Sequence, residues 1–152
     1  MVVMGMKVDK FRNKAAIMLG DGKKLEVNFF LSYHSAMHSG SETIFDVLNS
    51  KALFIPLEDT QTSEVIFVAK GQLMYVELLD REVVSSLYLR ELQIQVELLN
   101  GEVIEGEILI DMPQTKPRLS DFLNLPHEVL YLHREGCDTI INKRYISLLK
   151  EK

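Results

Sequence analysis

Alternating apolar and polar residues over 94–110 predict two antiparallel strands joined by a tight turn. Ile94, Val96 and Leu98 share one face of the first strand, and the polar residues between them share the other. This period of two is typical of strands that bury one face. The Asn100-Gly101 pair between the segments favours a hairpin, because its tight turn needs a positive φ that Asn and Gly tolerate.

The same order of signals occurs earlier in the chain, where residues 17–32 align with residues 96–111 and Asp21-Gly22 meets Asn100-Gly101. Three further pairs of segments follow in the same order: 44–49 with 119–124, 54–57 with 129–132, and 66–76 with 139–149. Chance similarity could explain one such pair, but it explains four in order poorly. We therefore predict an internal duplication, in which each half reads strand, tight turn, strand, short helical turn, strand, turn, strand.

The phrase "IFDVLN", repeated as "LSDFLN", predicts a single turn of helix in each half. Ser41 or Thr43, and Ser120, are natural residues for the start of these turns, because their hydroxyls accept a hydrogen bond from a backbone N–H. Thr43 and Asp46 also have the spacing of a capping box.

Asn49 and Asn124 fall where a helix end often adopts the left-handed conformation, which Asn tolerates. The apolar residues of each helical turn are expected to plug one end of a small barrel. The sequence thus predicts a mainly β protein of two tandem small antiparallel β-barrels, residues 1–78 and 79–152, packed together and each with one short helical turn.

Two features qualify this picture. Gly106 lies inside a predicted strand, where glycine usually marks a bulge or a sharp bend. The segment 78–91 between the halves contains no Pro or Gly, so it is not a flexible linker. Its β-prone part, 82–89, is expected to extend the sheet into the second half.

Composition and charge favour an ordinary globular protein of the cytoplasm. The chain has 17 basic and 22 acidic residues, a net charge of −5, which is the wrong sign for a protein that wraps nucleic acid. Residues 1–24 carry a net +4, which we interpret as a solvated basic face. The single Cys137 excludes an internal disulfide and fits a reducing compartment, and we expect neither a signal peptide nor a membrane helix.

The second half resembles a known family. "VELLNGEVIEGEILI" (96–110) resembles the first signature of Sm-like proteins, with an alternating strand, an Asn-Gly turn and a strand with an internal Gly. "IINKRYISLL" (140–149) resembles their closing strands. The resemblance implies barrels of the SH3/Sm-like type. The duplicated arrangement also resembles an uncharacterised bacterial domain family with a "G…SDFLN…NK" signature, which has no assigned activity.

The resemblance also implies candidate binding residues, because two loops line the RNA site of Sm-like proteins. The matching residues, together with their counterparts in the first half, are Asp46, Asn49, Asp121, Asn124, Asn142 and Lys143. The Asp and Asn residues have two interpretations. They either cap the helical turns or form exposed, repeated groups that bind a peptide, a base or a partner loop. Lys143 and its counterpart Lys70 could equally be exposed strand-end charges.

Two motifs could indicate a metal site or a catalytic thiol, but we interpret both as structural. His34 and His38 have the spacing of metal ligands on a helix, but they lie in a Ser- and Gly-rich segment that predicts a loop and offers no certain third ligand. Cys137 follows His133 by four residues, yet Gly136 between them indicates a turn, and a thiol nucleophile needs a positioned base. We therefore predict no metal, no cofactor and no catalytic residue.

We expect a non-enzymatic protein that acts through protein–protein interaction or assembly, and open-edged barrels make a homo-oligomer plausible. The alternative is an Sm-like RNA-binding module that uses the Asp/Asn and Asn/Lys loops and the basic segment 1–24. A third interpretation, an enzyme with a site between the barrels, requires a deep pocket that holds histidines or carboxylates in contact. The sequence shows no signature of a small-molecule substrate or a membrane partner.

Overall fold

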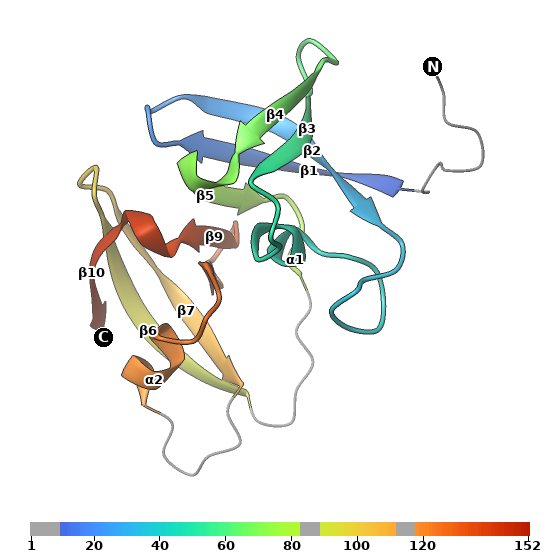
Figure 1. Cartoon of the computed structure of the whole chain (residues 1–152). Helices are drawn as coiled ribbons and strands as arrows, with labels where there is room; N and C mark the ends of the chain where they lie inside the picture. Colours follow the sequence, from blue (N-terminus) through green and yellow to red (C-terminus); the bar gives the residue numbers. More distant parts are fainter. Residues whose placement is uncertain (1–9, 83–88, 112–117) are drawn as a thin grey trace.

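The computed structural model describes residues 10–82, 89–111 and 118–152, which form antiparallel strands with short helices between them (Figure 1). The predicted strand over 82–89 lies almost wholly outside these residues. The first half contains β1 (Lys10–Leu19), β2 (Lys24–Ser32), α1 (Ile44–Leu48), β3 (Phe54–Asp59), β4 (Val65–Ala69), the 3-10 helix η1 (Lys70–Gln72) and β5 (Leu73–Leu78). The second half contains β6 (Leu89–Leu98), β7 (Val103–Asp111), α2 (Leu119–Leu123), β8 (Val129–Leu132), β9 (Thr139–Asn142), the 3-10 helix η2 (Lys143–Tyr145) and β10 (Ile146–Glu151).

Both predicted hairpins form, β1 with β2 and β6 with β7. Gly22 and Gly101 take the positive φ values of 91° and 90° that each turn requires. The side chains of Asp21 and Asn100 each accept a hydrogen bond at 2.9 Å from the backbone N–H two residues further on. The two turns are therefore built in the same way, as their Asp-Gly and Asn-Gly pairs predict.

The strands form one antiparallel sheet in the order β4-β3-β2-β1-β5-β9-β8 and a second in the order β10-β6-β7. A single bridge between Glu107 and His133 links β7 to the end of β8. Through that bridge the second half has the order β9-β8-β7-β6-β10, which matches β4-β3-β2-β1-β5 in the first half. The mainly β, antiparallel fold is confirmed, but over the described ranges the strands form open sheets and no closed barrel.

Strand β5 contributes to both hydrophobic cores of the molecule. Leu73, Val76 and Leu78 belong to the core of the first half, whereas Met74 and Tyr75 belong to that of the second. A strand covered on both faces needs no polar face, and residues 73–76 of β5 accordingly form a continuous apolar run before Glu77.

Strands β8 and β9 have the same double role. Val129 and Ile140 pack in the first core, and their neighbours Leu130 and Ile141 pack in the second. The second half of the chain therefore supplies two strands to the large sheet and side chains to both cores. Strands β5, β8 and β9 together form a wall that the two halves share.

The starts of the two helices differ. Thr43 begins α1 with the predicted capping box: its hydroxyl accepts from the Asp46 N–H at 3.1 Å, and its own N–H donates to the Asp46 carboxylate at 3.0 Å. The prediction that Ser120 caps α2 is wrong. Arg118 precedes α2 at the position of Thr43, and it pairs with Asp121 through its guanidinium instead of capping the helix.

Asn49 and Asn124 end the helices as expected, but not in the expected conformation. Their φ values are −96° and −94°, so neither residue is left-handed. The helices do cover the cores: Ile44 and Leu48 are buried in the first, and half-buried residues of α2 pack against the second.

Of the two features predicted at Gly106, a bulge or a sharp bend, the bulge is absent. The register of β6 with β7 runs through it without a shift, so the strand has no bulge there. A Cβ atom at this position would lie 2.6 Å from the carbonyl oxygen of His133 and 2.7 Å from the side chain of Leu132. Glycine is therefore needed so that the end of β8 can approach β7 and form the bridge.

Candidate functional site

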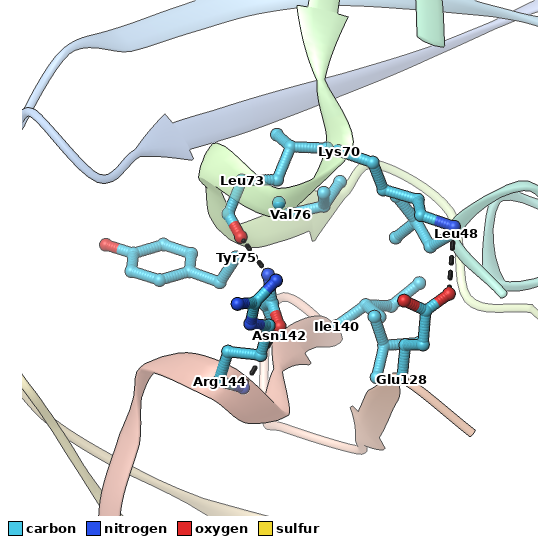
Figure 2. Close-up of a pocket in the computed structure, with 11 residues that line it drawn as sticks. Leu48, Lys70, Leu73, Tyr75, Val76, Glu128, Ile140, Asn142 and Arg144 are labelled. Atoms are coloured by element: carbon cyan, nitrogen blue, oxygen red, sulfur yellow. Dashed lines mark hydrogen bonds and ion pairs between the residues drawn. The ribbon is translucent and has the colours of Figure 1, made fainter. Parts of the chain in front are cut away.

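The two halves meet where β5 pairs with β9, and this junction is the best-defined composite surface of the chain (Figure 2). Tyr75 lies opposite Ile141 and Val76 opposite Ile140 in the antiparallel register. A cavity of about 30 Å³ remains between the halves, which is room for no more than one or two water molecules. The junction is therefore a packed interface and not a ligand site.

Polar side chains join the halves across this junction. The Asn142 amide donates to the Leu73 carbonyl at 2.9 Å, and the Asn49 amide oxygen accepts from the Glu128 N–H at 2.9 Å. Lys70 and the Glu128 carboxylate form an ion pair at 2.8 Å (Figure 2). Two of the predicted binding residues, Asn49 and Asn142, therefore hold one half of the chain against the other.

The ammonium of Lys143 binds carbonyls at and just beyond the C-terminal end of α2, the helix of its own half. Its ammonium donates to the carbonyls of Leu123 at 2.9 Å and Leu125 at 3.2 Å, and burial lowers its pKa. Lys70 donates in the same way to the carbonyl of Ser50, beyond the end of α1. Neither lysine is a free strand-end charge.

The remaining predicted residues also have partners. Besides capping α1, Asp46 accepts from His38 Nε2 at 2.7 Å. Asp121 pairs with Arg118, and the Asn124 amide donates to a carbonyl of α2. Asp46 lies with Lys143 in a larger cleft, whereas Asp121 and Asn124 line neither that cleft nor the junction cavity. Ligand binding by these residues stays a prediction.

A comparison of equivalent positions in the two halves reveals an exposed apolar surface on the first half. Val129 and Ile140 pack into the junction with exposures of 7% and 0%, but their equivalents Phe54 and Phe67 are 60% and 69% exposed. Phe67 lies opposite Pro56 in the pairing of β3 with β4. We call this surface, formed by Phe54, Pro56, Val65 and Phe67, the β3–β4 face.

The sheet edges also differ between equivalent strands of the two halves. Strand β9 pairs with β5. The equivalent of β9 is β4, and the equivalent of β5 is β10. Among the described strands, β4 and β10 each lie at the edge of a sheet (Figure 1). Leu148 of β10 is exposed at the position that Tyr75 occupies in β5. Exposed edges of this kind are templates for pairing with another strand.

One hydrogen bond of the junction, from the Glu128 backbone N–H to the Asn49 side chain, has no counterpart at the equivalent residues. Leu53 is the equivalent of Glu128. The Leu53 carbonyl accepts from the Lys70 N–H at 2.8 Å, and the Glu128 carbonyl accepts from the Lys143 N–H at 3.0 Å. The Glu128 N–H donates to Asn49, but neither the Leu53 N–H nor the amide oxygen of Asn124 has a hydrogen-bond partner among the described residues.

A second hollow is large enough for a small molecule. This cleft has a volume of about 480 Å³ and lies between the loop before α1, α2 and strands β7 and β8. Its apolar lining includes Phe45, Leu109, Phe122 and Leu130. Its described ionisable side chains are His38, Asp46, Glu82, His127, His133 and Lys143.

Glu82 anchors the start of α1 within this cleft. Its carboxylate accepts from the N–H groups of Ile44 at 2.6 Å and Phe45 at 3.1 Å, and its own N–H donates to the Tyr131 hydroxyl at 2.9 Å. Burial raises the pKa of Glu82 against the opposing effect of the two N–H donors. Sequence reasoning missed this residue, because its partners lie 38 and 37 positions away and no local pattern marks them.

A buried carboxylate supports the back of the cleft. Asp138, with 2% of its side chain exposed, accepts from Arg81 at 3.0 and 3.1 Å, from the Tyr131 hydroxyl at 2.8 Å and from the Arg134 N–H at 3.1 Å. Burial alone would raise the pKa of Asp138, but these hydrogen bonds outweigh it and lower the pKa. His133 Nδ1 lies 3.9 Å from the same carboxylate.

The cleft does place a histidine against a carboxylate, which the enzyme interpretation requires. Hydrogen bonds with the Ser39 backbone and with Asp46 raise the pKa of His38. However, Asp46 already accepts bonds at the start of α1, so its role there is structural. Burial raises the pKa of Cys137 and disfavours the nucleophilic thiolate.

Within the three described ranges, no cluster of three His, Cys, Asp or Glu side chains is arranged to hold a metal ion. In the same ranges no helix has the length and apolarity needed to cross a membrane. Comparison of the chain with protein-family models, curated proteins and solved structures finds no match. The functional argument therefore rests on the geometry of the chain itself.

Proposed function

We propose that the chain is a tandem pair of small, open-edged SH3/Sm-like β-barrels that acts as a non-enzymatic assembly module, in which copies join head to tail through β4 and β10. One observation carries this proposal. The second half packs on the first through Val129 and Ile140, and the first half exposes the equivalent Phe54 and Phe67. Exposed apolar surface beside an open sheet edge is typical of a protein interface.

The internal junction supplies the geometry of the contact between copies. Since β10 is the equivalent of β5 and β4 that of β9, the β5–β9 register places Leu149 of one copy opposite Phe67 of the next. The same register places the exposed Leu148 opposite Val68. Such pairing adds main-chain hydrogen bonds to the burial of the β3–β4 face.

Asn124 gains a role in this arrangement. In the junction, the Glu128 N–H donates to Asn49. Between copies, the Leu53 N–H of one molecule would donate to the Asn124 amide oxygen of the next. The contact thus brings together an exposed donor and an exposed acceptor that have no protein partner among the described residues.

The contact between copies should be weaker than the junction. Ala69 stands where Asn142 binds across the junction, so one side-chain hydrogen bond is missing, and Leu53 replaces Glu128, so the ion pair with lysine is missing too. Because the two surfaces differ, the contact is heterologous and generates a ring or an open filament. A reversible assembly is the expected result.

Phe67→Lys and Leu148→Lys test this proposal, each placing a charge in one of the two surfaces. Wild-type protein should form oligomers at micromolar concentration in sedimentation velocity, and each variant alone should sediment as a monomer. An equimolar mixture should give a dimer, because Phe67→Lys retains an intact β10 and Leu148→Lys an intact β4. Asn124→Ala should weaken assembly without abolishing it.

Leu99→Lys is the matched control, because Leu99 is an exposed apolar residue at a hairpin outside both surfaces. It should assemble as wild type does. Monomeric wild-type protein at 100 µM, on the order of ten times the tested range, would overturn the proposal. A mixture that stays monomeric would exclude the head-to-tail geometry.

Assembly is favoured over RNA binding because the side chains of Asn142 and Lys143 already donate hydrogen bonds to carbonyls of the chain itself. Binding of single-stranded RNA stays a prediction of the resemblance. A gel shift that appears at low salt and falls as salt rises would support it.

A further inference from the structure

The 480 Å³ cleft takes no part in the proposed assembly and has features of its own. Four rings follow one another along its wall: His127, Phe45, Tyr131 and His133. The distances between consecutive ring centroids are 5.8, 6.1 and 5.3 Å, with tilted or edge-on orientations. These are favourable distances for aromatic packing, so the row offers a flat ligand a continuous aromatic surface.

Most polar groups around the cleft are already satisfied. Both oxygens of Glu82 accept from α1, and the Tyr131 hydroxyl both donates to Asp138 and accepts from the Glu82 N–H. Lys143 is bound to two carbonyls, one at the end of α2 and one just beyond it. These groups shape the cleft but have little capacity left for a ligand.

His133 is the exception. Its Nε2 atom is buried and has no hydrogen-bond partner among the described residues. Its Nδ1 atom faces the Asp138 carboxylate at 3.9 Å, which favours the proton on Nδ1 and leaves Nε2 as an acceptor. A buried polar atom without a partner is rare in proteins and calls for a group that satisfies it.

We propose that the cleft binds a neutral small molecule that combines an aromatic ring with a hydroxyl or N–H donor, and that this donor binds His133 Nε2. The ring would pack against Phe45 and Tyr131. The carboxylates of Asp46 and Glu82 disfavour an anion, and the ammonium of Lys143, which lines the same cleft, disfavours a cation. The volume lies within the range of small-molecule sites, roughly 300–1,000 Å³.

Two probes of nearly equal shape test this site in the full chain. 4-Methylphenol carries the donor, and in 4-methylanisole a methyl group replaces the hydroxyl hydrogen. In an NMR titration, 4-methylphenol should bind saturably and shift the resonances of Tyr131 and His133. 4-Methylanisole should bind about tenfold more weakly, because it leaves Nε2 unpartnered.

His133→Phe keeps the ring row and removes the acceptor, so it should bind both probes equally. His127→Phe is the matched control and should retain the preference for 4-methylphenol. A measurement on wild-type protein keeps the test independent of the folding of any variant. The ¹⁵N shift of His133 Nε2 should move toward that of a hydrogen-bonded acceptor with 4-methylphenol and stay unchanged with 4-methylanisole.

No saturable binding of either probe, or equal affinity of wild-type protein for both, would overturn the proposal. A preference for 4-methylphenol that survives in His133→Phe would overturn the assignment of Nε2. Since Phe67→Lys and Leu148→Lys leave the cleft lining unchanged, both should bind 4-methylphenol as monomers. The outcome for this site is therefore separate from the outcome for assembly.

Discussion

Lys143 does for α2 what Lys70 does for α1: the ammonium of each lysine donates to a carbonyl at or just beyond the C-terminal end of the helix in its own half. Carbonyls at a helix end lack intrahelical partners and carry partial negative charge, so a cation stabilises them. Each lysine follows β4 or β9 directly, and it thereby ties the start of η1 or η2 to the helix of the same half. The two halves therefore share a tertiary contact as well as a sequence pattern.

Lys143→Met should destabilise the protein by about 1–3 kcal/mol, because two partly buried carbonyls lose a charged donor. Denaturant unfolding followed by circular dichroism measures this change. Lys51→Met is the control, since Lys51 is exposed, and it should shift the free energy of unfolding by less than about 0.5 kcal/mol. Equal stability of Lys143→Met and wild type would contradict the assigned role.

Gly106→Ala should destabilise the protein by more than about 1 kcal/mol, because the added Cβ would lie 2.6 Å from the backbone oxygen of His133. The bridge between β7 and β8 would have to open, which amide hydrogen exchange at His133 would detect. Gly71→Ala is a matched control, since its Cβ would meet nothing closer than a flexible arginine nitrogen at 3.6 Å. If both variants unfold alike, the close approach at Gly106 is not the constraint.

Asn142→Ala should cost about 1–3 kcal/mol, because the Leu73 carbonyl and the Arg144 N–H both lose a partner within a buried site. Thermal unfolding would show a lower midpoint. Gln61→Ala at an exposed loop serves as the control and should leave the midpoint unchanged. A junction that does not depend on the Asn142 amide would show the same midpoint in both variants.

Asp138→Asn should change how stability depends on pH. The folded-state pKa of Asp138 lies below its ordinary value near 4, so its contribution is fully present above about pH 4 and is lost as pH falls through the folded pKa. The difference in unfolding free energy between wild type and variant should therefore be large at pH 7 and shrink toward pH 2. Asp80→Asn, at an exposed position, should show no such trend. A difference that is constant from pH 7 to pH 2 would argue against a charged Asp138 in the folded state.

The sequence was sufficient for features that depend on neighbouring residues. The Asp21-Gly22 and Asn100-Gly101 turns and the Thr43–Asp46 capping box follow from local chemistry, and all of them form. The alternation of β6 also predicted its buried face correctly, with Ile94, Val96 and Leu98 inside. Even here the local signal has limits, because it placed the start of α2 at Ser120 and not at Arg118.

Features that depend on residues far apart in the chain were out of reach. The apolar residues 73–76 of β5 and 140–141 of β9 could not show that each strand packs in two cores. Glu82 binds α1 across more than thirty positions, and Asp138 binds Arg81 across 57. Gly106 was noticed, but its reason lies in His133, which no periodicity connects to it. The cleft is assembled almost entirely from such distant partners.

The wall shared by the two cores has a thermodynamic consequence. Strands β5, β8 and β9 place buried side chains in both cores, so unfolding of these strands would disrupt both cores at once. Neither half can then melt at a temperature of its own, and calorimetry of the monomeric Phe67→Lys variant should record one cooperative transition whose van't Hoff and calorimetric enthalpies agree. Expressing residues 1–78 alone would strip the first core of Val129 and Ile140, and the fragment should remain unfolded.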